Sequence, residues 1–275
     1  MSLLLLLIAT FLNQASLYQA YVSSPNPAPS PLSWSIFYTT KFSFPSFDHE
    51  SCSTGGLICT GSASSGDGLI NLTPWLDFPV PPVHQVGRIL YKIPVLGWPA
   101  VISTTFTFRV VKPQNSDGGD GLTFIMSPTA SPSPPGSSGS FLGISNPSLE
   151  AAGARLLAVE FDTYKNTFDI DGNHVGIDTN GVKNSLVSRS LNNTGIDLKS
   201  GRDIKVRVDY DIRTKSLQVS VAYASDPWMT FLRLPINISA YVPRAMYVGF
   251  TASTGTFFEH HQILNWEFTS TPIAT

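Results

Sequence analysis

Short runs of apolar and β-branched residues, separated by turn residues, recur along most of the chain. Residues 103–110 (STTFTFRV) alternate polar and apolar side chains with a period of two, as in a strand that packs one face on a core. The same period recurs at 205–211 and 217–223, on either side of a turn around Thr214, which predicts a meander. The predicted strands are 35–44, 88–93, 103–110, 122–126, 156–163, 174–178, 203–211, 216–223, 245–252 and 262–268.

No segment keeps helical periodicity for three turns, and no break rich in Gly and Pro divides the chain into two differently patterned halves. A chain of 275 residues could hold one large β-sandwich or two small domains, and the uniform strand pattern favours one. We therefore predict a single all-β domain over 34–270. A Pro/Ser-rich stretch at 127–140 lies between predicted strands and is expected to be a functional or a mobile loop.

The first residues are apolar from Leu3 to Leu12. A run of about ten residues fits the core of a signal peptide and is shorter than the roughly 20 residues that span a bilayer. We predict a signal peptide at 1–22, and hence a secreted, extracellular protein of the apoplast, with no membrane span in the rest of the chain. Residues 23–33 are rich in Pro and Ser and are expected to form an extended entry to the domain.

Composition and charge narrow the class of partner. Gly and Pro contribute 21 residues each and only 13% of residues are charged, which suits many strands joined by tight turns. The formal net charge is -2, and no Lys/Arg cluster runs along any segment. The chain therefore lacks the basic surface by which proteins bind nucleic acid or anionic membranes.

The chain has two cysteines, Cys52 and Cys59, on either side of Gly55 and Gly56. An even number in a chain predicted to be secreted favours a disulfide between them over a metal site. Two buried free thiols are the alternative.

Three N-glycosylation sequons begin at Asn71, Asn192 and Asn237, which agrees with a secretory route. Pro74 follows the sequon of Asn71 directly and makes that position the least favourable of the three.

Ligand-type side chains concentrate in residues 157–180 (LAVEFDTYKNTFDIDGNHVGIDTN). In an extended strand Glu160 and Asp162 face the same side, roughly 7 Å apart, so the two carboxylates can bracket a cation. The next predicted strand begins at His174 and can fold back beside them. Oxygen ligands suit calcium, whereas carboxylates combined with an imidazole suit manganese or zinc.

The loop between these two strands adds Asn166, Asp169 and Asp171. An acidic hairpin loop whose side chains cap a turn is the alternative interpretation. Buried carboxylates on a Val- and Phe-rich strand cost several kcal/mol unless they are paired or bind metal. We therefore favour a metal site, in which two adjacent ions sharing Asp162 and Asp169 are feasible.

Several blocks between Phe42 and Phe268 resemble the legume-lectin family in both order and spacing. The blocks are GRILYKIPV, FTFRV, GDGLTFIM, GSFLGI, LAVEFDTYKN, NHVGID, VGFTASTG and HQILNWEF. The resemblance implies a concanavalin-like jelly-roll β-sandwich that binds glycans or glycoproteins and depends on calcium and manganese, or another transition metal. It further implies a role in plant defence or stress response, and homodimers, which are common in the family.

The resemblance also implies individual site residues. The transition metal would be held by Glu160, Asp162, Asp169 and His174. Calcium would be held by Asp162, the backbone carbonyl of Tyr164, Asn166 and Asp169. The sugar would be bound by the carboxylate of Asp120, the amide of Asn166, the ring of Tyr164 and a backbone N–H near Ser140. Family members hold this aspartate through a cis peptide, here between Gly119 and Asp120.

The sequence departs from the family pattern in a few positions. The segment between Asn166 and Asp169 is shorter than in typical members, and so is the specificity loop at 256–259. Ile170 stands where Pro is frequent, Asn184 replaces a Ser that holds a metal-bound water, and Ser140 replaces a common Gly. These departures leave an alternative open, a degenerate lectin-fold interaction protein with weak or no sugar binding.

An enzyme is the other alternative, because some β-sandwich glycosidases carry an E-x-D-x-x-E strand. Here Glu160 and Asp162 are present, but Lys165 takes the last position, so the motif supplies no pair of catalytic carboxylates. We expect no enzymatic activity. His260 and His261 are expected in a loop or at a strand edge rather than in a metal site.

Overall fold

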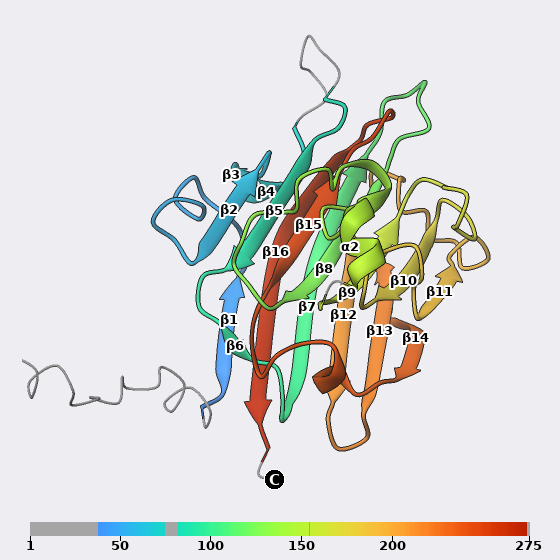
Figure 1. Cartoon of the computed structure of the whole chain (residues 1–275). Coiled ribbons are helices and arrows are strands. Elements are labelled where there is room, and N and C mark those ends of the chain that lie inside the picture. Colours follow the sequence, from blue (N-terminus) through green and yellow to red (C-terminus); the bar gives the residue numbers. More distant parts are fainter. Residues whose placement is uncertain (1–37, 75–81, 154, 274–275) are drawn as a thin grey trace, which may run out of the picture. The chain divides into compact units, whose positions relative to one another are not determined.

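The computed structural model describes residues 38–74, 82–153 and 155–273. Its strands form two antiparallel sheets of eight strands each, within one compact unit (Figure 1). The first sheet has the order β14-β13-β12-β7-β16-β4-β3, with β1 paired to β16. The second sheet has the order β11-β10-β9-β8-β15-β5-β2, with β6 paired to β15.

The strands of each sheet have the following bounds. The first sheet contains β1 (Thr40–Phe44), β3 (Ser64–Gly66), β4 (Leu69–Asn71), β7 (Ala100–Val111), β12 (Ile204–Asp211), β13 (Ser216–Tyr223), β14 (Met229–Pro235) and β16 (His260–Pro272). The second contains β2 (Leu57–Gly61), β5 (Val86–Tyr91), β6 (Val95–Leu96), β8 (Gly121–Ser127), β9 (Leu157–Asp162), β10 (His174–Asp178), β11 (Val187–Ser190) and β15 (Ala245–Ser253). The described residues also contain three short helices, η2 (Gly139–Phe141), α2 (Pro147–Ala152) and η3 (Ile238–Ala240).

The all-β prediction is confirmed, since each of the ten predicted runs overlaps a strand. The sequence pattern missed β2, β3, β4, β6, β11 and β14, which are short or lack strict alternation. The predicted meander is present, because β12 and β13 are antiparallel neighbours joined through the turn at Thr214. The predicted signal peptide at 1–22 and the segment 23–33 lie outside the described residues, within which the strands run from Thr40 to Pro272.

Aromatic side chains from both sheets meet in the core between the sheets. Phe106 of β7 lies 4.8 Å from Phe250 of β15 and 6.0 Å from Phe161 of β9, measured between ring centroids. All three are fully buried, and burial of each such ring stabilises the fold by about 1.5–3 kcal/mol. Because a strand alternates its faces, Phe161 in this core directs Glu160 and Asp162 to the opposite face of the second sheet.

That opposite face is also covered. Leu142, Ile144 and Val182 pack there with Ala158 and Ile125 in a second, smaller hydrophobic cluster. The covering segment includes η2 and leads into α2, which lies over the strands of the second sheet (Figure 1). All six residues of β9 are therefore buried, including its two carboxylates.

The predicted disulfide is confirmed: Cys52 and Cys59 are bonded, with Cα atoms 5.4 Å apart, and the alternative of two free thiols is wrong. The peptide between Gly119 and Asp120 is cis, as the family resemblance implied. His260 and His261 are fully buried as the first residues of β16. Of the two expected positions, the loop is wrong, and the histidines lie at the beginning of a strand.

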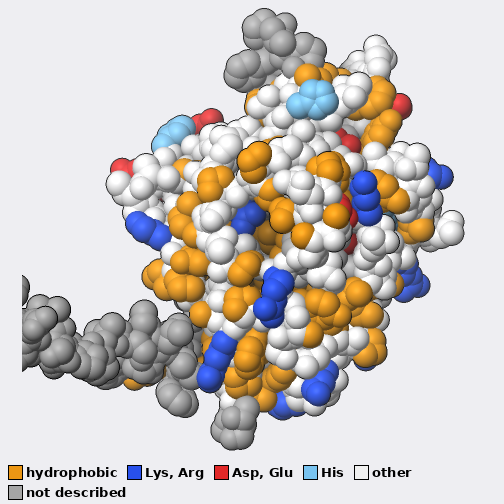
Figure 2. Space-filling view, viewed as in Figure 1, with side chains coloured by type: hydrophobic (Ala, Val, Ile, Leu, Met, Phe, Trp, Pro, Cys, Tyr) orange, Lys and Arg blue, Asp and Glu red, His pale blue; other side chains and the backbone are white. Residues whose placement is uncertain are grey.

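The surface carries no concentrated basic patch on the face shown in Figure 2, where Lys and Arg side chains stand singly among hydrophobic and uncharged ones. Within the part of the chain that the structure describes, helices are too short to cross a bilayer.

Candidate functional site

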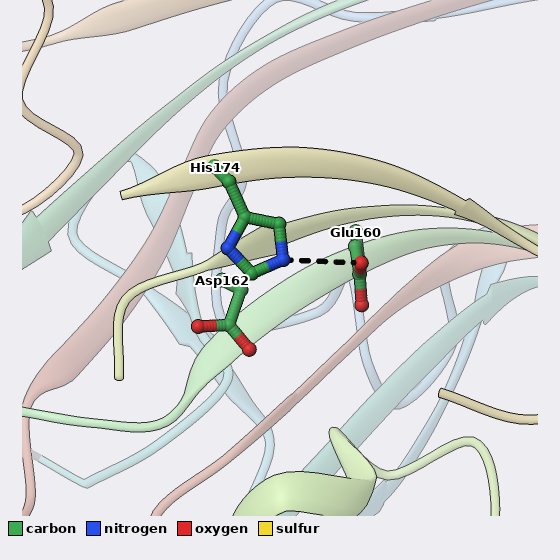
Figure 3. Close-up of side chains that lie close together, drawn as sticks. All are labelled: Glu160, Asp162 and His174. Atoms are coloured by element: carbon green, nitrogen blue, oxygen red, sulfur yellow. Dashed lines mark ion pairs between the residues drawn. The ribbon is translucent and has the colours of Figure 1, made fainter. Parts of the chain in front are cut away.

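Three ligand-type side chains converge on the outer face of the second sheet. Glu160 and Asp162 come from β9, and His174 begins the neighbouring strand β10 (Figure 3). His174 lies directly opposite Asp162 in the antiparallel pair, so its ring projects from the same face. Each of the three offers one ligand atom, and these atoms lie within 4.8 Å of one another. We call these three residues the metal-type cluster.

The ring of His174 is held in one orientation. Its Nδ1 lies 2.8 Å from the backbone carbonyl of Asp171, which accepts a hydrogen bond from Nδ1–H in the neutral tautomer that carries its proton there. Nε2 then faces the cluster, 3.4 Å from Oε1 of Glu160. This arrangement, with one ring nitrogen bonded to a carbonyl and the other presented, is that of a metal-ligating histidine.

Glu160 is supported by a neighbour that the sequence did not indicate. Ser185 donates its hydroxyl to Oε1 of Glu160 at 3.2 Å. Asn184, the position where the family pattern has a serine, is exposed. The hydroxyl next to the metal-type cluster therefore comes from Ser185. The replacement of Ser by Asn at position 184 does not by itself leave the cluster without a neighbouring hydroxyl.

The cluster concentrates negative charge in a buried place. Burial raises the pKa of Asp162 well above its usual value, and the charges of Glu160 and Asp169 raise it further. Burial lowers the pKa of His174, but the bond to Glu160 and the charges of Glu160 and Asp169 outweigh it, so the net shift is upward. A divalent cation would offset this repulsion.

The loop after β9 folds back on itself at Asn166 and Asp169. The backbone N–H of Asn166 donates to Oδ2 of Asp169 at 2.7 Å, and the N–H of Asp169 donates to the carbonyl of Asn166 at 3.2 Å. Oδ1 of Asn166 is buried and has no hydrogen-bond partner among the described residues. An unpartnered buried oxygen beside carboxylates fits a hard cation such as calcium. Asp169 itself is not one of the three residues of the metal-type cluster.

A hollow of about 360 Å³ opens beside this loop; we call it the primary hollow. All four residues predicted to contact sugar line it, namely Asp120, Ser140, Tyr164 and Asn166. Further lining side chains that the sequence did not assign to the sugar site include His84, Phe141 and Phe257. Phe257 falls in the loop at 256–259 that was flagged, whereas no local motif marked His84.

Asp120 is almost fully buried at the base of the primary hollow, with 5% of its surface exposed. Its backbone N–H donates to the carbonyl of Ser253 at 3.0 Å, and its carbonyl accepts from the N–H of Thr163 at 2.9 Å. Burial raises the pKa of its carboxyl to about 7, with the charges of Glu259 and Asp169 adding to the effect. When ionised, this carboxylate can accept hydrogen bonds from two neighbouring hydroxyls.

Two aromatic rings form one side of the primary hollow. The centroids of Tyr164 and Phe257 lie 5.4 Å apart, and both rings are half-buried. Such ring faces pack against apolar C–H groups while the Tyr hydroxyl stays free to bond. The hollow thus joins a hydrogen-bonding carboxylate to an apolar wall.

A buried polar network lies under this wall. Glu259 is fully buried, accepts a short hydrogen bond from the hydroxyl of Thr163, and contacts Nε2 of His261 at 2.9 Å. The hydroxyl of Thr73 joins the other ring nitrogen of His261 at 3.0 Å. Thr163 directly follows Asp162, so this network ties the metal-type strand to the loop that carries Phe257.

The three sequon asparagines differ in exposure. Asn71 is half-buried in β4, where its amide oxygen accepts a hydrogen bond from Gln262, whereas Asn192 and Asn237 are exposed.

The chain matches the legume lectin domain model over residues 39–275. It is 35% identical to anti-H(O) lectin 1 of Cytisophyllum sessilifolium over 82% of this chain and 94% of that protein. It is 36% identical to the L-type lectin-domain containing receptor kinase VIII.1 of Arabidopsis thaliana over 82% of this chain, but spans only 32% of that kinase. Among solved structures, peanut lectin with a nine-residue peptide superposes with a TM-score of 0.74 at 31% identity, covering 86% of this chain and 100% of peanut lectin.

Proposed function

Because the chain belongs to the legume lectin family, a family of non-enzymatic carbohydrate-binding proteins with a jelly-roll sandwich, we propose that its primary hollow binds sugar and is organised by calcium and manganese. One observation carries this proposal. Asn166 lines the primary hollow and also leaves its buried Oδ1 without a partner among the described residues. The same side chain can therefore bind a cation through its oxygen and donate its amide to a sugar hydroxyl.

Each ion has its own set of ligands. The metal-type cluster of Glu160, Asp162 and His174 combines carboxylates with an imidazole, and we assign the transition metal to it together with Asp169. We assign calcium to the oxygens of Asp162, Tyr164, Asn166 and Asp169. When bound, the two ions supply positive charge that offsets the buried carboxylates.

The protein's own residues orient the sugar. Asp120 accepts hydroxyl protons, Asn166 donates its amide, and the rings of Tyr164 and Phe257 cover the apolar face of a pyranose. A backbone N–H beside Ser140 completes the set. A cation on Asn166 fixes the direction of its amide, which is why metal loss is expected to weaken sugar binding.

Two features support a role outside the cell. The predicted signal peptide and the disulfide between Cys52 and Cys59 both fit an oxidising, extracellular compartment. We propose that the protein acts there on glycans or glycoproteins, in plant defence or stress response.

The turn at Asn166 and Asp169 favours a second candidate. Their two mutual hydrogen bonds fix the shortened loop without any ion. A loop that is stable by itself is compatible with an interaction protein that kept the fold and lost metal-dependent sugar binding.

A glycan array probed in calcium and manganese tests the proposal. Binding by the purified protein, lost on chelation and in Asp120→Ala and Asn166→Ala, is the expected result. Absence of binding to every glycan in the presence of both ions would favour the interaction protein.

A further inference from the structure

A hollow of about 560 Å³ lies on the first sheet and shares no lining residue with the primary hollow. Arg109 and Val111 of β7, residues 201–203 and residues 223–225 line it, and we call it the arginine hollow. We propose that it is a separate binding site, for a sulfate ester carried by a small hydroxylated ring. The proposal goes beyond the proposed function, because neither the ions nor the residues of the primary hollow take part in it.

The order of the strands brings the lining segments together. β12 is antiparallel to both β7 and β13, and its first residue, Ile204, lies opposite Phe108 and Tyr223. The beginning of β12 therefore meets the ends of β7 and β13 at one end of the first sheet (Figure 1). Phe108 is buried in the core, so the alternation of β7 turns Arg109 to the outer face of the sheet.

Arg109 contributes part of its guanidinium to the arginine hollow. Its Nε and Nη2 lie 2.7 and 2.6 Å from Oδ1 of Asp203, the residue before β12. A guanidinium has five N–H donors, and this pair occupies only one of its edges. Both side chains are about one-third exposed, so the remaining donors of Arg109 and the second oxygen of Asp203 can reach a ligand.

Arg202 supplies a second guanidinium that is held in place by an aromatic ring. Its Cζ lies 3.4 Å from the centroid of the Tyr223 ring. Tyr223 is itself buried, and its hydroxyl accepts a hydrogen bond from the N–H of Asp197 at 3.0 Å. Arg202 is exposed and forms no ion pair with a carboxylate of the described residues. A guanidinium stacked on a ring keeps its N–H edges available for bidentate bonds to an oxyanion.

The charges around the arginine hollow favour an anion. The ammonium of Lys205 donates to the carbonyl of Ala224 at 3.2 Å, which places a third cation beside the two arginines. Among the described residues, two carboxylates belong to this lining or contact it, namely Asp203 and Asp226, which accepts from the hydroxyl of Ser225 at 3.0 Å. Three cations against two carboxylates leave a local charge of +1, in a chain whose formal net charge is -2.

The size and the charge of the arginine hollow indicate the class of ligand. Its volume of about 560 Å³ exceeds the 360 Å³ of the primary hollow, which we assign to a sugar ring, so it has room for an oxyanion and the ring that carries it. A sulfate ester has a single negative charge, whereas a phosphate ester has about −1.5 to −2 at pH 7. The carboxylate of Asp203 in the wall favours the single charge, and it can accept hydrogen bonds from hydroxyls of the ring.

Titration calorimetry in chelator tests this site while the primary hollow lacks its ions. The probes are the 4- and 6-sulfates of galactose, galactose 6-phosphate, inorganic sulfate and unmodified galactose. We expect at least one sulfated galactose to bind with a Kd of about 1 mM or tighter, as bidentate charge-assisted bonds allow. Inorganic sulfate and galactose 6-phosphate should bind at least about threefold more weakly, and galactose should not bind.

Two substitutions at exposed positions test the lining. Arg202→Gln removes the cation that stacks on the ring, and Ala224→Glu adds a carboxylate to the wall. Each should weaken binding of the sulfated galactose at least about tenfold, as expected when a hydrogen bond between charged groups is lost. The matched controls are Arg213→Gln and Thr230→Glu, at exposed positions of the same sheet that do not line the hollow, and both should bind as wild type.

The outcomes are distinct from those that test the proposed function. A wild-type protein that binds no sulfated galactose, or binds inorganic sulfate as tightly, would overturn the arginine hollow as an ester site whatever the glycan array shows. Retained affinity in both variants, or an equal loss in the controls, would also overturn it, with melting temperatures to confirm folding. With calcium and manganese present, Arg202→Gln should keep the wild-type glycan profile, because Arg202 does not line the primary hollow.

Discussion

Gly176 lies directly opposite Glu160 in the antiparallel pair of β10 and β9, and the Glu160 carboxylate fills the space that a side chain at Gly176 would need. A Cβ at this position would overlap Oε1 of Glu160. Because Glu160 is buried in the metal-type cluster, a displacement away from a new Cβ would change its position relative to Asp162 and His174. The glycine is therefore a requirement of the cluster rather than of the strand.

Gly176→Ala is predicted to displace Glu160 and weaken the affinity for manganese at least about tenfold, as loss of a supporting contact does in other metal sites. Bound metal is measured by elemental analysis after dialysis against limiting manganese, and glycan binding is expected to fall in parallel. Gly56→Ala is the control, because its nearest atom would be a Phe44 ring carbon at 3.1 Å that can shift. Full metal occupancy in folded Gly176→Ala would show that Glu160 is dispensable.

Gly255→Ala is predicted to weaken glycan binding without weakening metal binding. A Cβ there would stand 2.6 Å from Oδ2 of Asp120, so the carboxylate must leave its present position, while none of the atoms that the Cβ would meet belongs to the metal-type cluster. Glycan affinity should drop about tenfold or more, as expected when a charge-assisted hydrogen bond is lost, with manganese content unchanged. Glycan binding is measured by titration calorimetry, and a parallel loss of metal would contradict this separation of the two sites.

The sequence predicted the strands that carry the cluster because local periodicity determines them. Glu160 and Asp162 are two residues apart, and His174 begins a run that matches β10 at both ends. The segments that bury these carboxylates were not predicted. The Val- and Phe-rich strand pattern indicated burial, but the covering cluster around Leu142 and Val182 comes from distant segments that periodicity does not connect.

Loops were harder to predict than strands for the same reason. The family pattern has a serine at position 184, but the hydroxyl that contacts Glu160 belongs to Ser185. Which of the two residues faces Glu160 depends on how the loop folds. His84 enters the primary hollow because hydrogen bonds to residues 254–255 bring its segment there. His261 is buried through its contact with Glu259, which no motif in the sequence indicated.

The disulfide is predicted to stabilise the fold measurably. Cys52 and Cys59 close a short loop at the start of β2, and a loop of this length contributes about 2–3 kcal/mol by restricting the unfolded chain. The double variant Cys52→Ser, Cys59→Ser should lose about that much free energy of unfolding in urea. Reduction of the wild type should reproduce the loss, and addition of reductant to the double variant should change nothing; a further loss there would point to another cause.

The three sequons are predicted to be used unequally in a secretory host. The hydroxyl of Thr73, which completes the first sequon, is fully buried and bonded to Glu259 and His261, and Asn71 accepts a bond from Gln262. Asn237 is exposed. Peptide mass mapping before and after enzymatic deglycosylation should find glycan on Asn237 and none on Asn71. Occupied Asn71 would mean that modification precedes the folding of β4.

The last prediction concerns the pH dependence of stability without metal. Burial, together with the charges of Glu259 and Asp169, raises the pKa of Asp120 from 3.8 to about 7. Between these two values the folded protein holds this proton and the unfolded chain does not. The contribution of Asp120 to the free energy of unfolding is therefore fully present below pH 3.8 and is lost as pH rises towards 7.

Asp120→Asn removes that loss because an amide does not ionise. In chelator at pH 8 the variant should be more stable than wild type by about 2–4 kcal/mol, and at pH 4 the two should be close, as the direction of the pKa shift requires. Urea unfolding at both values measures the difference, with Asp226→Asn, a change at an exposed carboxylate, as the control. The variant should bind no glycan, since an amide cannot replace both acceptors of a carboxylate. Equal stability at pH 8 would mean that Asp120 ionises there without cost and that burial does not raise its pKa.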